Sequence, residues 1–202
     1  MTAIRLHRHH NLLRACAMAS AMVLAASCKD KPSEPIEGAG DPENISRVTV
    51  TLTPVGGGTV VTSMRFDPDG TSLPQPVGTA QGTLALTKGK TYSGTIDLLN
   101  DLDPNNVIKI TDEVTDEANF HRFFYTFTCG GVSVPVSSLN RDTQSPSQPF
   151  GTTFQVVVDA TAASTTSCNL HVELHHFETA KGDGTGATYD TDLSIDFPVT
   201  IG

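Results

Sequence analysis

Polar and apolar residues alternate along most of the chain, and this is the pattern of strands that bury one face. In residues 47–55, RVTVTLTPV, two valines and a leucine alternate with threonines; a GGG turn follows, and then TVVTSMRF in residues 59–66. This arrangement predicts a β-hairpin. Residues 82–87, GTLALT, and residues 91–99, TYSGTIDLL, flank KGK and predict a second hairpin.

The same period of two returns in the second half of the chain. It is found in FHRFFYTFTC (120–129), FQVVVDA (154–160), CNLHVELHHF (168–177) and DLSIDFPVTI (192–201). The last segment has one fully apolar face, formed by Leu193, Ile195, Phe197, Val199 and Ile201. Short strands separated by Gly, Pro and Asp turns predict an all-β fold. We expect a single immunoglobulin-like antiparallel β-sandwich over residues 46–202, with one short acidic helix.

The first 27 residues have the features of a signal peptide. Three arginines precede the apolar segment ACAMASAMVLAAS, and Ser27 is a small residue before Cys28. LAASC resembles the lipobox of bacterial lipoproteins, in which the cysteine is lipidated. Residues 1–27 are therefore expected to be a lipoprotein signal peptide, and residues 28–45 a flexible, proline-rich tether. The domain would be anchored to the outer membrane, on its periplasmic face or at the cell surface; free secretion is the alternative.

The excess of acidic over basic residues limits the classes of molecule that the chain is expected to bind. Cleavage before Cys28 would remove three of the 13 basic residues and none of the 22 acidic residues, so the mature chain would have 10 basic residues and a net charge of −12. This charge argues against nucleic acid and anionic membranes as partners and is compatible with cations. After the tether, about 155 residues remain, enough for one domain with a single core.

The two cysteines after Cys28 predict a disulfide, and the lack of catalytic motifs argues against an enzyme. Cys129 and Cys168 form an even pair in an oxidising compartment, which predicts a disulfide; two unpaired thiols are the alternative. There is no P-loop, no nucleophile elbow and no recognisable pairing of a serine or cysteine with a histidine, so we do not expect an enzyme. Only the abundance of carboxylates favours a hydrolase.

The segment TDEVTDEANFHRFFYTF combines acids, one histidine and an aromatic strand. Thr111 is expected to cap a short helix, whose acidic first turn suits the helix dipole. Glu113, Glu117 and His121 are four residues apart, so a helix extending to His121 would place all three on one face. Glu117 and His121 would then form a chelating pair. If the strand begins at Phe120 instead, His121 lies at the junction and the acids form only an exposed cap.

The strand CNLHVELHHF carries further candidate ligands. Its apolar residues predict that His171, Glu173 and His175 project away from the core, either as metal ligands or as a solvent-exposed polar face. His176 falls in the core register at the end of the strand, where a polar group needs a partner. Acids beside glycine or proline are typical turn formers. Asp67 and Asp69 lie in the segment DPDG, and Asp190 and Asp192 follow the glycine-rich segment KGDGTGATY, so all four are expected to form turns.

Several segments together resemble a known family. VTVTLTPVGGGTVVT, GTLALTKGKTYSGTIDLLN, ITDEVTDEANFHRFFYTF and DTDLSIDFPVTI are similar, in this order, to small bacterial lipoproteins labelled type 1 periplasmic binding fold superfamily protein. The resemblance extends from about Arg47 to Ile201 and implies a companion of a TonB-dependent outer-membrane receptor. It also marks three groups of residues: Glu117 with His121; Leu174, His175 and His176; and Asp190, Thr191 and Asp192. The family label implies two α/β lobes, whereas the strand pattern predicts a β-sandwich.

Together these observations predict a lipid-anchored binding protein of the cell envelope, which captures a divalent metal ion or a small solute for an outer-membrane receptor. The ion would be zinc, copper or iron. Its ligands would be Glu117, His121, His176, Asp190 and Asp192. The alternative is a non-catalytic interaction module, which docks on an envelope receptor through its acidic surface and has no ligand of its own. The distances from His121 to His176 and to Asp190 separate these alternatives.

Overall fold

The computed structural model describes residues 44–67, 80–184 and 188–202. The predicted signal peptide, the predicted lipidation site Cys28, nearly all of the predicted tether and Asp69, which was predicted to lie in a turn, are outside these residues. In the part of the chain that is described, no helix is long and apolar enough to cross a membrane.

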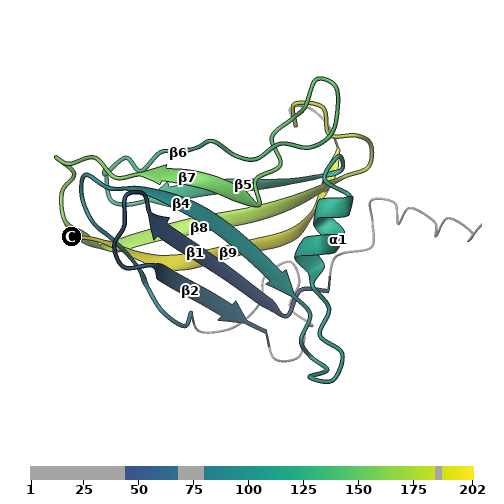
Figure 1. The fold of residues 1–202 in the computed structure, drawn as a ribbon, viewed down its shortest axis with the longest axis horizontal. Coiled ribbons are helices and arrows are strands. Elements are labelled where there is room, and N and C mark those ends of the chain that lie inside the picture. Colours follow the sequence, from purple (N-terminus) through teal and green to yellow (C-terminus); the bar gives the residue numbers. More distant parts are fainter. Residues whose placement is uncertain (1–43, 68–79, 185–187) are drawn as a thin grey trace, which may run out of the picture. The chain divides into compact units, whose positions relative to one another are not determined.

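Two β-sheets pack against each other around one hydrophobic core (Figure 1). The first sheet contains, in spatial order, β2 (Val61–Phe66), β1 (Arg47–Pro54), β4 (Thr91–Leu99), β7 (Thr153–Val157) and β6 (Val136–Ser137). The second sheet contains β3 (Leu84–Leu86), β9 (Tyr189–Ile201), β8 (Thr165–Phe177) and β5 (His121–Thr128). The predicted all-β sandwich is confirmed. One pairing, β3 with β9, is parallel, whereas a fully antiparallel fold was predicted.

The alternation within β1 shows how the core is built. Val48, Val50 and Leu52 have no exposed surface, while the residues between them are half-buried or exposed. Each buried side chain of this kind contributes about 1.5–3 kcal/mol through removal of its apolar surface from water. The core also requires a glycine: a Cβ at Gly94 in β4 would lie 2.4 Å from the ring of Phe154, so no larger residue fits beneath that ring.

The two predicted hairpins have different outcomes. β1 and β2 pair in antiparallel register from Arg47 with Phe66 to Leu52 with Val61, which confirms the first hairpin. The second prediction is wrong, because β4 pairs with β1 and β7 in one sheet while β3 pairs with β9 in the other. The KGK turn, with Gly89 at a φ of 70°, therefore carries the chain from one sheet to the other. Alternation predicts two adjacent strands but not whether they share a sheet.

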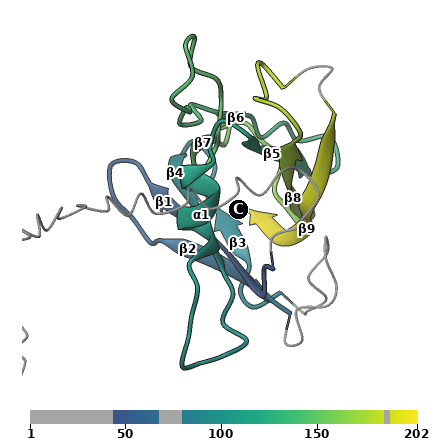
Figure 2. The same cartoon turned by 90° about the vertical axis from the view of Figure 1, so that its right-hand side faces the viewer.

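The helix α1 (Ile110–Asp116) lies at one end of the two sheets (Figure 2). It buries Ile110 and Val114, and it begins after Lys109 without a side-chain cap. The prediction that Thr111 caps this helix is therefore wrong. The Thr111 hydroxyl instead accepts a hydrogen bond from the Leu98 N–H at 2.6 Å, which fastens the helix to the end of β4.

The predicted disulfide between Cys129 and Cys168 is confirmed. Cys129 follows β5 directly, and Cys168 lies in β8 next to Asn169, which pairs with Thr128. The bond therefore closes one end of the β5–β8 ladder. The opposite end of the same ladder is formed by His121 and His176.

Candidate metal centre

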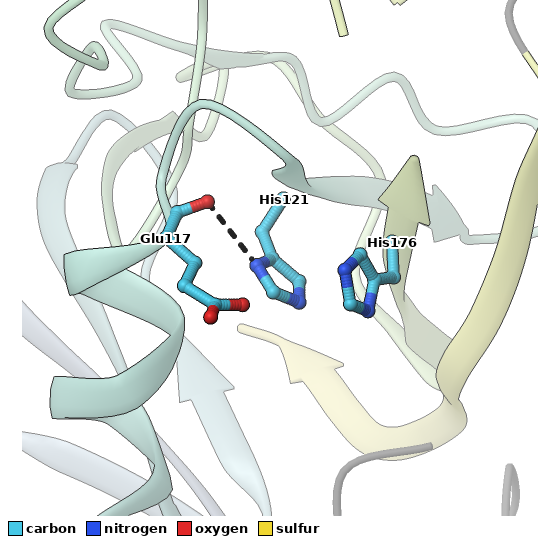
Figure 3. Close-up of side chains that lie close together, drawn as sticks. All are labelled: Glu117, His121 and His176. Carbon is cyan, nitrogen blue, oxygen red and sulfur yellow. Dashed lines mark hydrogen bonds between the residues drawn. The ribbon is translucent and has the colours of Figure 1, made fainter. Parts of the chain in front are cut away.

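Two histidines from distant parts of the chain meet at the end of the β5–β8 ladder. His121 is the first residue of β5 and lies directly opposite His176 of β8. Residues directly opposite each other in an antiparallel pair project from the same face, so both rings point into the domain. Their centroids are 4.2 Å apart, and the two residues are 0% and 3% exposed. Figure 3 shows the two rings beside each other, with Glu117 next to His121.

An irregularity in β9 adds a carboxylate to this pair. Leu174 pairs with Leu193, but the next residue of β8, His175, pairs with Thr191, so Asp192 is an extra residue in the ladder. Strict alternation would turn Asp192 away from the core face of Leu193; at a β-bulge both side chains can face inward. Asp192 is 1% exposed, and its Oδ2 lies 3.5 Å from His121 Nε2 and 3.9 Å from His176 Nδ1.

Glu117 completes the group from the other side. It is the C-cap residue of α1, so the helix ends before His121, which is the first residue of β5. Neither arrangement considered for this segment is the one observed: the helix does not reach His121, and the half-buried Glu117 is not part of an exposed cap. The Glu117 carbonyl accepts a hydrogen bond from His121 Nδ1 at 3.3 Å (Figure 3). One ligand atom from each of Glu117, His121 and His176 lies within 4.8 Å of the other two.

The hydrogen bond to Glu117 also assigns the proton on His121. A carbonyl can only accept, so Nδ1 of His121 donates this hydrogen bond; in the neutral form of the ring, Nε2 then carries the lone pair. That lone pair lies 3.5 Å from a carboxylate oxygen of Asp192. Two acceptors this close are stabilised by a cation between them, either a proton or a metal ion. Histidine ligands of metals commonly donate their second ring N–H to a carbonyl in this way.

The spacing of the group suits a tetrahedral ion after a small contraction. Ligand atoms about 2.1 Å from such an ion are roughly 3.4 Å from one another. The two contacts of Asp192, at 3.5 Å and 3.9 Å, already have this spacing. The separations among Glu117, His121 and His176, all within 4.8 Å, would have to shorten by up to about 1.4 Å.

Two atoms of this group lack hydrogen-bond partners. Nδ1 of His176 and Oδ2 of Asp192 are both buried, and neither makes a hydrogen bond within the described part of the chain. Buried polar atoms are nearly always hydrogen-bonded, because leaving one unsatisfied costs about 1–3 kcal/mol. A metal ion between them would satisfy both atoms.

The charge state of His176 also favours coordination. Burial lowers its pKa, and the neighbouring His121 lowers it further; Asp192, Glu117 and Asp190 oppose this effect without reversing it. His176 is therefore neutral at pH 7 and has a lone pair for a ligand bond.

The remaining predicted ligand, Asp190, and two other acids singled out in the sequence lie at the margin of the group or outside it. Asp190 pairs with His176 in the β8–β9 ladder but is exposed. Neither Asp190 nor Asp192 belongs to the three mutually close ligand groups, but Asp192 is buried against both histidines. Glu113 is exposed on α1. Asp67, expected in a proline-containing turn, is fully buried, and its N–H donates to the carbonyl of Ser46.

The opposite face of β8 carries a second group of polar residues. Nδ1 of His171 lies 2.9 Å from Asp196 on β9, and its Nε2 lies 3.5 Å from Glu173. His171 and Glu173 are half-exposed, as expected for a polar outer face. His175 differs, because it is 8% exposed and stacks on Tyr189 with ring centroids 3.9 Å apart. The partner Asp196 was not predicted, and only the register of β8 against β9 identifies it.

Comparisons of the chain with protein-family models, with curated proteins and with solved structures found no match. The resemblance to envelope lipoproteins therefore remains a prediction from the sequence. The described residues define a β-sandwich with three mutually close candidate ligands, Glu117, His121 and His176, at one end of its sheets, and the buried carboxylate of Asp192 lies beside the two histidines.

Proposed function

We propose that this protein binds a divalent transition-metal ion through Glu117, His121, His176 and Asp192. The observation that carries the proposal is the convergence of these side chains from separate segments, with buried atoms of His176 and Asp192 that lack hydrogen-bond partners in the described part of the chain. Mixed imidazole and carboxylate ligands suit zinc, iron, copper and nickel, whereas calcium and magnesium prefer oxygen ligands.

The cellular setting is part of the same proposal and is supported by the sequence. The signal-peptide pattern before Cys28 and the polar tether after it favour a lipid-anchored protein of the cell envelope. The resemblance to companions of TonB-dependent receptors favours capture of a scarce metal ion, or of a small solute containing it, for such a receptor. In this setting the acidic mature chain would attract cations.

Calorimetric titration of the purified protein tests the metal site. Zinc, copper, nickel and iron would each be added to the wild type and to the His121→Ala/His176→Ala variant, with magnesium and calcium as controls. We expect saturable binding of at least one transition metal to the wild type and a large loss in the variant. Circular dichroism would establish that the variant is folded. Indistinguishable titrations of the two folded proteins would overturn the proposal.

Thermal unfolding provides a second measurement. An ion that binds only the folded state adds about 2.7 kcal/mol of stability at 100 times its dissociation constant. For a domain of this size, that gain raises the melting temperature by roughly 5–11 °C. The double variant should show no such rise. A rise of equal size in both proteins would indicate that the ion binds elsewhere.

A second candidate function is docking on an envelope receptor without a ligand. It is favoured by exposed apolar side chains in the loop before α1, namely Leu102, Val107 and Ile108, next to the exposed acids of the helix. The two candidates differ in one simple observation. A docking module would contain no stoichiometric metal after purification and would bind its receptor equally well in the presence of a chelator.

A further inference from the structure

The turn that joins Glu117 to His121 is held by residues from two other loops and by the last residue of β8. The carbonyls of Ala118, Asn119 and Phe120 each accept a hydrogen bond from outside the turn. The Lys181 ammonium donates to the carbonyl of Ala118. The carbonyl of Asn119 accepts from the Lys181 backbone N–H at 3.0 Å and from the Gln144 side-chain amide at 3.1 Å. The Phe177 backbone N–H donates to the carbonyl of Phe120 at 2.8 Å. The backbone between the two candidate ligands is therefore fixed from both sides.

Lys181 is bound to a carboxylate as buried as itself. Its ammonium lies 2.8 Å from Oδ2 of Asp142, and both side chains have no exposed surface. Asp142 in turn accepts hydrogen bonds from the N–H groups of Gln148 at 2.6 Å and Gln144 at 3.2 Å, and from the Gln144 amide at 2.7 Å. The carboxylate thus holds the lysine and the loop that contains Gln144 in one arrangement.

The electrostatics of Asp142 agree with this geometry. Burial by itself would raise its pKa, but the hydrogen bond from Gln148 and the ammonium of Lys181 more than offset burial, so the pKa lies below its ordinary value. Replacing a buried ion pair by apolar residues is often neutral or stabilising, so the presence of one is weak support for a role in stability. A role in fixing a particular local conformation accounts for the contacts with Ala118 and Asn119.

We propose that Lys181 and Asp142 form a positioning pair for the metal site, which holds the turn so that Glu117 and His121 remain close to His176. This inference rests on the proposed function. Lys181 lies five residues after His176 and contacts the turn immediately before His121, so a single side chain connects the segments of both histidines. Groups that orient metal ligands commonly contribute 10–100-fold to affinity, because a fixed ligand set loses less freedom on binding.

The test is a titration of the purified full-length protein with Co²⁺, whose visible absorption reports both affinity and coordination geometry. Asp142→Asn and Lys181→Met each remove one member of the pair. We expect about 10–100-fold weaker Co²⁺ binding and an altered absorption band in both variants. Gln144→Ala removes one contact with the turn and one hydrogen bond to Asp142 but leaves both members of the ion pair, so it should weaken binding in the same direction by a smaller factor.

Asp101→Asn is the matched control. Asp101 is also a buried carboxylate, bound to Arg47 and to the Ser46 hydroxyl, and neither partner contacts the turn. The control variant is expected to lose stability but to bind Co²⁺ like the wild type.

The outcomes separate this inference from the proposed function. If the wild type binds Co²⁺ and folded Asp142→Asn or Gln144→Ala binds it with the same affinity and spectrum, the positioning role is wrong while the metal site stands. If Asp101→Asn weakens binding as much as Asp142→Asn does, the effect is one of general stability, and the positioning role is again wrong. A wild type that binds no transition metal overturns both proposals. If Asp142→Asn does not fold, Gln144→Ala decides between these outcomes.

Discussion

The two faces of β8 carry similar residues in very different arrangements. The inner set consists of His176 with His121, Asp192 and Glu117, and the outer set consists of His171, Glu173 and His175 with Asp196. Both sets contain two imidazoles and two carboxylates. The inner set brings together the end of α1, the first residue of β5, the end of β8 and a bulge in β9, whereas the outer set contains three residues of one strand and a single neighbour from β9.

The two sets contain the same kinds of side chain, so residue types alone do not define a candidate metal site. The inner set is a candidate because its side chains come together from separate segments of the chain. Residues on the same face of a strand are about 6.7 Å apart for each step of two, so the Cα atoms of His171 and His175 are roughly 13 Å apart. Among the described residues, the ligand atoms of the outer set do not all lie within 4.8 Å of one another, whereas those of Glu117, His121 and His176 do. Each outer histidine instead lies beside a carboxylate, with Glu173 between the two. In the inner set, atoms of His176 and Asp192 remain without hydrogen bonds in the described part of the chain.

The largest expected effect is on zinc affinity, which should fall when a histidine of the inner set is replaced but not when a histidine of the outer set is replaced. His176→Ala should weaken zinc binding by about 100-fold or more, because roughly 10–16 kcal/mol of binding energy shared by four ligands corresponds to a few kcal/mol per ligand. His171→Ala on the outer face should leave zinc affinity unchanged. Competition with a chromophoric chelator would measure both variants. Equal losses in the two variants would remove the distinction between the faces.

A smaller effect is expected from pH on the metal-free protein. The lowered pKa of His176 means that the folded state binds a proton less readily than the unfolded state does. Stability should therefore be full above the ordinary histidine pKa of about 6.5 and fall as the pH drops below it. Burial lowers the pKa of His175 in the same direction, although Glu173 opposes this effect.

Urea denaturation at several pH values would measure this dependence in the presence of a chelator. His176→Gln should reduce the loss of stability in acid, and His175→Gln should remove a further part of it. If the free energy of unfolding of the His176→Gln variant falls with decreasing pH as steeply as that of the wild type, His176 does not contribute to the pH dependence of stability.

The smallest effect is expected on the free energy of unfolding when a residue of the outer set is replaced. Asp196→Ala removes the contact of 2.9 Å with His171, but the two side chains are 54% and 37% exposed. Solvent screening limits such pairs to about 1 kcal/mol or less. Urea denaturation near pH 7 would measure the change, and zinc affinity should be unaffected. A loss of several kcal/mol would indicate that the outer set is part of the structural core.

The sequence predicted the features that depend on local pattern. The period-two alternation indicated the sandwich and the β1–β2 hairpin, and the even pair of cysteines indicated the disulfide. The same reasoning was wrong for residues 82–99, because a tight turn can join strands of two different sheets as easily as strands of one. It was also wrong for Thr111, whose hydroxyl binds β4 instead of capping the helix.

The candidate metal site could be predicted from the sequence only in part. The core register of His176 was visible in the sequence, and it marked that residue as a polar group in need of a partner. The partner His121 could not be derived from spacing, because it depends on the register between β5 and β8. The buried pair of Lys181 and Asp142 was not predicted, since both residues lie in loops without any periodic pattern.

The sequence by itself determined the class of fold, because alternation within a strand selects which face is buried and needs only neighbouring residues. Only the tertiary structure decided which polar groups meet. His121 and His176 are brought together by strand register, and Asp192 is turned inward by one extra residue in β9. Both arrangements depend on hydrogen-bonded pairing between segments far apart in the chain, and no local pattern specifies such pairing.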